Sequence, residues 1–269
     1  MQTDVTPHPA VNAVLDELHA RIQAILGNRL TGLYLYGSLV TGDFDPAVSD
    51  LDLLAATDGD LRADDFARLE RMHAEFARER PEWDDRIEVA YLAVTALQSF
   101  RKRRTQIAVI SPGEPFHFQD AGLDWLVTWY VVREQGVALA GPPPQQLIAP
   151  IAKEEYLAGV RDYAIEFRQR VTQPMPRGSQ AYAILTMCRA YHTLKTGELA
   201  SKARSAQWAR TQWPQWSPLI QQALLWRSIP RGEPMDDGAT LPETRRFVLF
   251  AAGECEKVSV ATPRMKPDD

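Results

Sequence analysis

The sequence predicts an α+β protein, in which a small mixed sheet covered by helices is followed by an all-α helical bundle. Three observations support this prediction. Short apolar runs bounded by turn residues alternate with helical patterns in the first half of the chain. The strand patterns fade past Thr95, and helical patterns fill the chain from residue 153 onward. The stretch GPPPQQ at 141–146 forms a stiff turn, so we divide the chain into domains of residues 1–142 and 143–269.

The first domain is expected to begin with a helix and to contain three strands. Apolar residues recur at helical spacing from Val11 to Leu26, and Gly27 ends the pattern. Two short apolar runs and the alternating segment RIEVAYL are typical of strands, and a charged helix separates the second strand from the third. In chain order, the predicted elements are a helix at 11–26, strands at 33–36 and 51–54, a helix at 62–80 and a strand at 86–92.

The rest of the chain is expected to be helical. The segment LDWLVTWYVVRE at 123–134 has a strongly apolar helical pattern, which ends near Gly136. The terminal stretch PRMKPDD has no such pattern and is expected to be disordered. The helices of the second domain are predicted at residues 153–171, 180–196, 203–212, 217–227 and 241–258.

The charge of the chain argues against extensive binding of nucleic acid. The 269 residues carry a formal net charge of −5, whereas such binding needs a basic surface. The charge is unevenly distributed: residues 1–150 have 13 Lys+Arg against 22 Asp+Glu, and residues 151–269 have 17 against 13. An acidic half suits a site for cations, although solvated surfaces that happen to differ would give the same counts. We expect no nucleic-acid partner.

The cysteines and the start of the chain indicate a cytoplasmic protein. Cys188 and Cys255 lie far apart in the sequence and read as free thiols in a reducing compartment. The start MQTDVTPHPA lacks the charged and apolar segments of a signal peptide. No apolar run approaches the roughly 18–20 residues that a membrane span needs. We expect a monomer that does not associate with membranes.

The segment LYLYGSLVTGDFDPAVSDLDL at 33–53 contains the strongest chemical signal. Asp50 and Asp52 are two residues apart at a strand, so their side chains share one side of it. Neighbouring carboxylates repel each other, and Mg²⁺ relieves this repulsion by binding one or two carboxylates together with phosphate oxygens. Gly37 lets a phosphate approach the backbone closely, and Ser38 adds a hydroxyl and an amide. These residues predict a nucleoside-triphosphate site in which Mg²⁺ bridges the protein and the phosphates.

The same segment resembles the signature of the polymerase-β-type nucleotidyltransferases, in which Gly-Ser, a gap and Asp-x-Asp follow one another. The stretch YGSLVTGDFDPAVSDLDLL has all three parts. The resemblance implies that Asp50 and Asp52 hold Mg²⁺ and that Gly37 and Ser38 contact the triphosphate. It also implies a third carboxylate on a later strand.

Glu88 is the candidate for this third carboxylate. In RIEVAYL it lies opposite the apolar face formed by Ile87, Val89 and Tyr91. Burial of a glutamate among core residues is costly without compensation, which favours a functional role. We expect Glu88 to act as the general base that deprotonates the acceptor hydroxyl. The structural alternative is a glutamate that faces solvent from a half-exposed strand.

The second half of the chain narrows the resemblance. AILTMCRAYHTLKTGELASKARSAQWA at 183–209 is similar to the C-terminal helical domain of bacterial aminoglycoside adenylyltransferases of the streptomycin/spectinomycin type. REQGVALAGPPP at 133–144 also resembles the interdomain segment of that family, so the likeness covers about residues 12–258. It implies that the enzyme transfers AMP from ATP to a hydroxyl group of an antibiotic and releases pyrophosphate. We expect ATP and Mg²⁺ to bind in a cleft between the domains.

The family resemblance also assigns two residues of the helical domain to ATP. Lys202 would contact the ATP phosphates, and Trp226 falls where the family places an aromatic residue near ATP. Each has a structural alternative. Lys202 reads equally as a surface lysine at the start of a helix, where a cation is mildly disfavoured by the helix dipole. Trp226 reads as a core residue of its helix.

One departure from the family bears on the acceptor. Ser179 and Gln180 stand where streptomycin-modifying members tend to have acidic residues that meet the cationic groups of the drug. We therefore expect spectinomycin, which needs fewer ionic contacts, rather than streptomycin. Two alternatives stay open: a nucleotidyltransferase that acts on a small molecule other than an antibiotic, and a non-catalytic nucleotide-binding or toxin-neutralising protein with the same fold.

Overall fold

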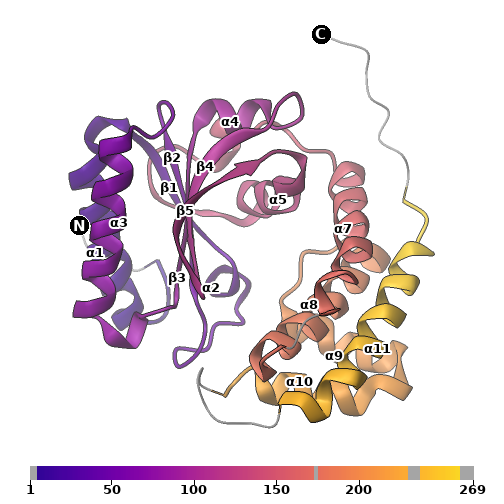
Figure 1. The fold of residues 1–269 in the computed structure, drawn as a ribbon. Helices are drawn as coiled ribbons and strands as arrows, with labels where there is room; N and C mark the ends of the chain where they lie inside the picture. Colours follow the sequence, from indigo (N-terminus) through magenta and orange to yellow (C-terminus); the bar gives the residue numbers. More distant parts are fainter. Residues whose placement is uncertain (1–4, 173–174, 230–236, 261–269) are drawn as a thin grey trace. The chain divides into compact units, whose positions relative to one another are not determined.

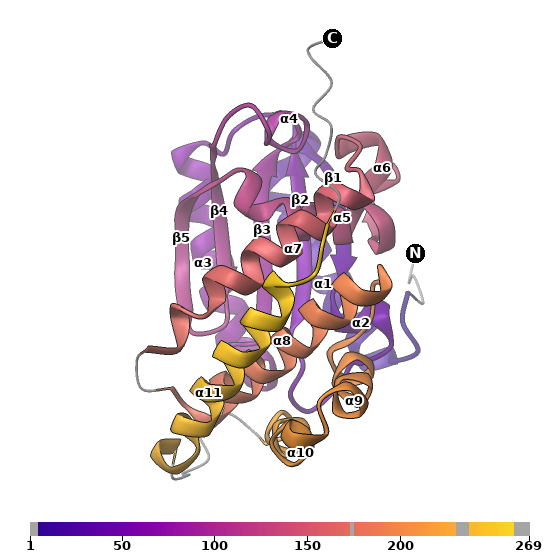
Figure 2. The same ribbon diagram turned by 90° about the vertical axis from the view of Figure 1, so that its right-hand side faces the viewer.

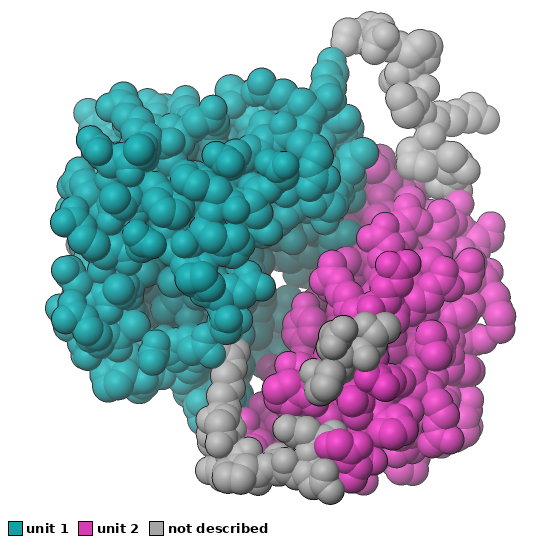
Figure 3. Space-filling model, viewed as in Figure 1, with its two compact units in different colours: residues 1–150 teal, residues 151–269 magenta. Residues whose placement is uncertain are grey.

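The chain divides into two compact units, residues 1–150 and residues 151–269 (Figure 3). The computed structural model describes residues 5–172, 175–229 and 237–260, so the predicted disorder of PRMKPDD concerns residues outside the described part. The sequence placed the division at 142/143, and the units divide eight residues later. Helix α6 (Pro144–Leu147) packs against helices α4 and α5 of the first unit, which explains the difference.

The first unit is built on a six-stranded mixed sheet in the order β5-β4-β3-β2-β1-β6. Figure 2 shows β5 to β1 side by side in this order. Strands β2 and β3 are parallel, and every other neighbouring pair is antiparallel. The strands are β1 (Leu30–Tyr36), β2 (Leu51–Thr57), β3 (Ile87–Ala93), β4 (Thr105–Ser111), β5 (Glu114–Ala121) and β6 (Val137–Ala140).

Helices cover both faces of the sheet. Helices α1 and α3 lie side by side on one face, and α5 lies on the other (Figure 1). The α-helices of this unit are α1 (Pro9–Leu26), α2 (Ser38–Thr41), α3 (Ala63–Glu79), α4 (Val94–Ser99), α5 (Leu126–Gln135) and α6 (Pro144–Leu147). Short 3-10 turns add residues 27–29, 81–83 and 123–125. The three strands and three helices expected here from their apolar patterns are thus present.

The structure corrects the sequence analysis for residues 105–140, where no strand was predicted. Strand β4 has only a short apolar run, and its pairing with β3, such as Ala90 with Val109, makes it part of the sheet. Strand β5 is largely polar and pairs with β4 alone, and β6 is a partly exposed edge strand. Local pattern alone does not identify such strands, because their stability depends on the neighbouring strand.

The core of the first unit lies between the sheet and helices α1 and α3. The strand residues in this core alternate along the chain: Leu33, Leu35, Leu51, Leu53, Ala55, Ile87, Val89 and Tyr91. Since successive strand side chains point to opposite faces, Asp52 and Glu88 belong to the face away from α1 and α3. Tyr36 belongs to that face for the same reason. The core packing therefore determines on which face of the sheet the polar residues gather.

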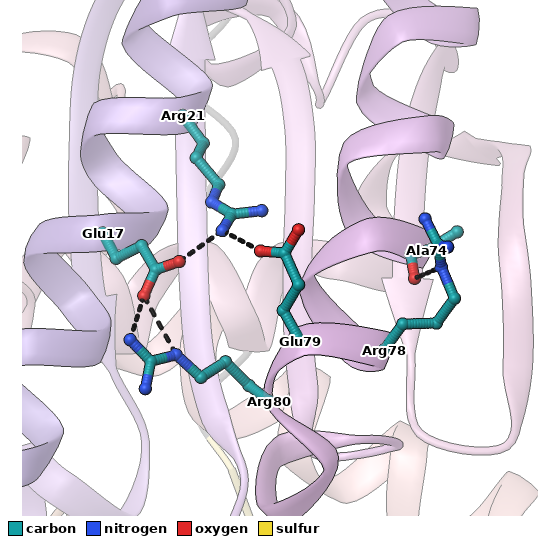
Figure 4. Close-up of polar contacts among 6 residues, drawn as sticks. All are labelled: Glu17, Arg21, Ala74, Arg78, Glu79 and Arg80. Carbon is teal, nitrogen blue, oxygen red and sulfur yellow. Dashed lines mark hydrogen bonds and ion pairs between the residues drawn. The ribbon is translucent and has the colours of Figure 1, made fainter.

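An ion-pair network joins α1 to α3 and the turn after it (Figure 4). The carboxylate of Glu17 pairs with Arg21 and, at 2.8 Å, with Arg80. Arg21 also pairs with Glu79 at the end of α3. Because one carboxylate and one guanidinium each serve two partners, the network fixes two helices that the apolar core already brings together.

In the Glu17→Gln variant, the free energy of unfolding is expected to fall less on acidification than in the wild type. Burial alone would raise the pKa of Glu17, but hydrogen bonds from Arg80 and Arg21 outweigh burial and lower that pKa below its ordinary value of 4.5. A carboxylate whose pKa is lowered by folding stabilises the folded state above its unfolded pKa, and this stabilisation is lost as the pH falls through the folded pKa.

Urea unfolding at pH 7 and at several values below about pH 4.5 measures this effect. The wild type should lose up to about 1 kcal/mol more free energy of unfolding on acidification than the Glu17→Gln variant. Glu75 is an exposed residue of α3, the helix that carries Glu79 of the network, and its replacement by glutamine should leave the wild-type pH dependence intact. Identical pH curves for wild type and Glu17→Gln would show that the network contributes nothing.

The second unit is a bundle in which α8 contacts every other long helix. Its helices are α7 (Lys153–Phe167), α8 (Arg177–Thr196), α9 (Lys202–Gln212), α10 (Ser217–Trp226) and α11 (Asp237–Glu256). Figure 2 shows α7, α8 and α11 lying side by side. The five helices predicted from apolar periodicity are confirmed, with ends that shift by a few residues. In the described part of the chain, we find no helix whose length and apolar character would let it cross a membrane.

Candidate functional site

Three polar side chains form a row across neighbouring strands β1, β2 and β3, at one end of these strands. In the strand register, Tyr36 on β1 is opposite Asp52 on β2, and Asp52 is opposite Glu88 on β3. Residues that pair directly across neighbouring strands point to the same face, and neighbouring strands are about 4.8 Å apart. The structure therefore brings two of the predicted site residues, Asp52 and Glu88, together on the face away from α1 and α3.

A glycine at the end of β1 packs directly against one of these carboxylates. Gly37 has a φ of 76°, and a Cβ placed on it would lie 1.9 Å from Oδ2 of Asp52. Any other residue would therefore displace the Asp52 carboxylate, and only glycine adopts such a φ without strain. Ser38 follows at once as the first residue of the short helix α2. The predicted Gly-Ser turn thus lies against the aspartate at the start of β2.

The loop that leads to Asp50 is held by its own hydrogen bonds and by Arg86. The backbone amide of Asp45 donates to the hydroxyl of Ser49 at 2.9 Å. The Arg86 guanidinium donates to the carbonyls of Ser49, at 2.6 Å, and Pro46, at 2.9 Å. Asp50 comes directly after this loop and before the first residue of β2. A fixed loop gives Asp50 a defined position relative to Asp52.

Within the row, Tyr36 contacts Glu88 directly. Its hydroxyl donates a hydrogen bond to Oε1 of Glu88 at 3.2 Å, across the strand that holds Asp52. Neither Tyr36 nor Arg86 was predicted to belong to the site. In the sequence, Tyr36 stands out only because it immediately precedes Gly37, and Arg86 only because it is a cation immediately before a strand. Neither signal identifies a contact without the register of the sheet.

The donor set suits a hard divalent cation. Mg²⁺ in sites that handle phosphates usually takes one or two protein carboxylates and completes its shell with phosphate oxygens and water. Asp50 and Asp52 offer two carboxylates at one end of β2, and the absent side chain of Gly37 leaves the Asp52 carboxylate in place. Within the described ranges, no group of three or more His, Cys, Asp or Glu side chains is arranged to hold a metal ion by itself.

Lys202 belongs to the second unit and is the first residue of α9. Ser201 caps this helix, since its hydroxyl accepts a hydrogen bond from the Arg204 amide at 3.2 Å. The Lys202 ammonium lies 4.2 Å from the ring centroid of Tyr182, which is 46% exposed. A cation over an aromatic ring is stabilised by the ring quadrupole, which offsets the unfavourable helix dipole at this end. A contact of Lys202 with ATP stays a prediction.

Trp226, the second residue assigned to ATP from the helical domain, is buried. Its side chain is 7% exposed, and the guanidinium of Arg177 lies 4.7 Å from its ring centroid. The position agrees with the structural alternative of a core residue at the end of α10. A role of Trp226 at ATP also stays a prediction.

The residue at the departure from the family pattern has a structural role inside the second unit. Gln180 is fully buried, and its side-chain carbonyl accepts hydrogen bonds from the hydroxyls of Thr240 and Thr244, both at 2.9 Å. Its amide nitrogen donates to the carbonyl of Met175 at 2.9 Å. Gln180 therefore joins α8 to α11. Its neighbour Ser179 is exposed and uncharged.

Two family models match the chain, one in each half. Residues 15–109 match the nucleotidyltransferase domain, and residues 146–249 match the C-terminal domain of aminoglycoside adenylyltransferases. The first match contains the whole Tyr36, Asp52 and Glu88 row. The second contains Lys202 and Trp226.

Similar proteins cover nearly the whole chain. Proteins named aminoglycoside (3'') (9) adenylyltransferase from Klebsiella pneumoniae and Shigella flexneri are each 26% identical over 266 residues, which is 92% of this chain and 96% of theirs. The Escherichia coli protein of that name is 26% identical over 267 residues. The crystal structure of spectinomycin adenyltransferase AAD(9) from Enterococcus faecialis, solved with ATP and spectinomycin, has a TM-score of 0.71 at 16% identity. The match covers 90% of this chain and 98% of the Enterococcus faecialis chain, and it shows a shared fold.

Proposed function

Because the chain belongs to the aminoglycoside adenylyltransferase family of polymerase-β-type nucleotidyltransferases, we propose that it transfers AMP from ATP to a hydroxyl group of an aminoglycoside-type antibiotic. The observation that supports this reaction most is the pairing of Asp52 with Glu88 on β2 and β3, with Gly37 packed against Asp52. The pairing supports the proposal because the carboxylate proposed to hold Mg²⁺ and the carboxylate proposed to accept a proton are direct neighbours across the two strands.

Each residue of the row has a role in the proposed reaction. Glu88 accepts the proton of the acceptor hydroxyl, whose oxygen attacks the α-phosphorus of ATP. The bond from the acceptor oxygen to phosphorus forms, the bond to the β-phosphate oxygen breaks, and pyrophosphate leaves. Asp50 and Asp52 would hold Mg²⁺, which when bound offsets the negative charge on the phosphate oxygens. Gly37 and Ser38 form the turn that the triphosphate contacts.

The helical unit supplies the remaining proposed contacts with ATP. Lys202 would meet the phosphates as a point charge, and the ring of Tyr182 beneath it would keep the ammonium in place. Trp226 would act near ATP as in the family, through a position that Arg177 and the helix core hold. Both assignments rest on the family resemblance, which for Lys202 is carried by residues 183–209 and for Trp226 by its position alone.

Spectinomycin is the proposed acceptor. The similar structure from Enterococcus faecialis was solved with spectinomycin, and the curated relatives are named for the 3'' and 9 positions of aminoglycosides. In this chain Gln180 is directed into the core of the second unit, and the exposed neighbour Ser179 has no charge. An acceptor that needs few ionic contacts therefore suits positions 179 and 180 better than a drug with strongly cationic groups.

A pyrophosphate-release screen tests the proposal. Purified protein is incubated with Mg²⁺ and ATP, GTP or CTP, in combination with spectinomycin, streptomycin and other aminoglycosides. Release is expected with ATP and spectinomycin and should be much weaker with streptomycin. Release with streptomycin alone would overturn the acceptor assignment. No release with any antibiotic would overturn the antibiotic proposal and point to a different small-molecule acceptor.

A further inference from the structure

We propose that Tyr36 is a positioning residue for Glu88, whose carboxylate it holds through the tyrosine hydroxyl. The inference rests on the proposed function, in which Glu88 is the general base. It concerns a residue of the sheet outside the Gly-Ser and Asp-x-Asp pattern. The contact that carries it is the hydrogen bond of 3.2 Å from the Tyr36 hydroxyl to Oε1 of Glu88.

The sheet fixes both ends of this contact. Tyr36 is the last residue of β1, and its side chain is 8% exposed, so the ring has little freedom to move. The register puts Asp52 between Tyr36 and Glu88 on the same face. The phenol ring therefore extends past Asp52, and its hydroxyl reaches the carboxylate two strands away.

The hydrogen bond can orient Glu88, whose side chain has several rotatable bonds. Ordering such a side chain costs conformational entropy. A buried phenol that donates to one carboxylate oxygen supplies part of the orientation before the substrate arrives. A general base misplaced by about 1 Å can lose about a hundredfold in rate, so this orientation affects turnover rather than substrate binding.

The chain offers a matched control on the same strand and face. Tyr34 lies two residues before Tyr36, and its hydroxyl donates to the carbonyl of Pro142 at 2.8 Å. Both tyrosines are buried and both hydroxyls are hydrogen-bonded. They differ in the group that accepts, which for Tyr34 is a backbone carbonyl and for Tyr36 is the proposed base. Loss of each hydroxyl therefore separates a structural effect from an effect on Glu88.

Steady-state kinetics with ATP and spectinomycin provide the first test. Tyr36→Phe should lower kcat about tenfold and leave KM for both substrates within about twofold, since the hydroxyl acts on the base and not on binding. Tyr34→Phe should leave kcat unchanged. In the Glu88→Gln background, Tyr36→Phe should cause no further loss, because an amide at position 88 cannot act as the general base and no base is left to orient. Full kcat in Tyr36→Phe, or an equal loss in both backgrounds, would overturn the proposal.

A second measurement does not depend on turnover. In protein labelled with ¹³C at tyrosine Cζ, the Tyr36 resonance is assigned with the Tyr36→Phe variant. It should shift in Glu88→Gln and stay in place in Glu114→Gln, since Glu114 is an exposed residue of β5. No shift in Glu88→Gln would refute the contact itself. A shift in a protein that modifies no antibiotic would uphold the contact and count against the proposed function alone.

Discussion

Replacement of Asp52 by asparagine is expected to abolish AMP transfer while the protein stays folded. Asparagine has the shape of aspartate, so the packing against Gly37 is preserved. The substitution removes the negative charge that would bind Mg²⁺, and a bound metal ion contributes several kcal/mol to the stabilisation of charge in the transition state. Each 1.4 kcal/mol changes the rate tenfold, so a loss on the order of a thousandfold or more is expected.

Turnover and thermal unfolding of the purified variant measure the two halves of this prediction. Asp58 gives a matched control, because it follows the far end of β2 and forms an exposed ion pair with Arg29 at 3.2 Å. Asp58→Asn should keep wild-type turnover. The melting temperature of Asp52→Asn should stay within a few degrees of the wild type. Near-native turnover of Asp52→Asn would show that Asp52 is not part of the metal site.

The second large effect is expected from a methyl group at Gly37. In Gly37→Ala the new Cβ would lie 1.9 Å from Oδ2 of Asp52, so the carboxylate has to move. The backbone is also strained, because φ at this position is 76°. A displacement of about 1 Å at a reacting site can cost about a hundredfold in rate, and we expect a loss of kcat of that order.

Gly27 separates the collision from the strain. Its φ of 56° and ψ of −134° are close to the 76° and −145° of Gly37, but a Cβ there would have no atom within 4 Å. Gly27→Ala should therefore share the destabilisation that this backbone conformation imposes and keep most of the activity. If Gly37→Ala and Gly27→Ala lost the same activity, backbone strain and not the displaced Asp52 carboxylate would explain the effect.

The fold could be predicted from the sequence wherever a segment's own pattern decides its structure. Helix α1, strand β3 and the helices of the second unit have clear periodicity, and the structure contains them. Strands β4, β5 and β6 were missed: β4 has only a short apolar run, β5 is largely polar, β6 has four residues, and each depends on the strand beside it. The small sheet of the prediction is thus a six-stranded one.

The residues of the candidate site could be proposed from the sequence, but their geometry could not. Residue type and spacing suggested Asp50 and Asp52, and the family resemblance suggested Glu88; their roles stay predictions. The direct pairing of Asp52 with Glu88 depends on the parallel register of β2 and β3, which the crossover through α3 and the core beneath them determine. The role inferred for Tyr36 depends on a third strand as well, so no local pattern could have indicated it.

The surroundings of two residues of the helical unit could not be predicted from the family pattern. Gln180 was considered for its place near a drug, and the structure shows a buried side chain that bonds to Thr240 and Thr244. Trp226 is a buried residue beside Arg177, and its expected role at ATP stays a prediction. Both positions depend on contacts between helices far apart in the sequence, which periodicity does not reveal.

Mass spectrometry of spectinomycin after incubation with the protein, ATP and Mg²⁺ tests the proposed reaction itself. The wild type should add one adenylyl group to each drug molecule and release one pyrophosphate with it, and Asp52→Asn should add none. Spectinomycin that stays unmodified after prolonged incubation with the wild type would rule out the reaction, and the same adduct from Asp52→Asn would rule out the role of Asp52.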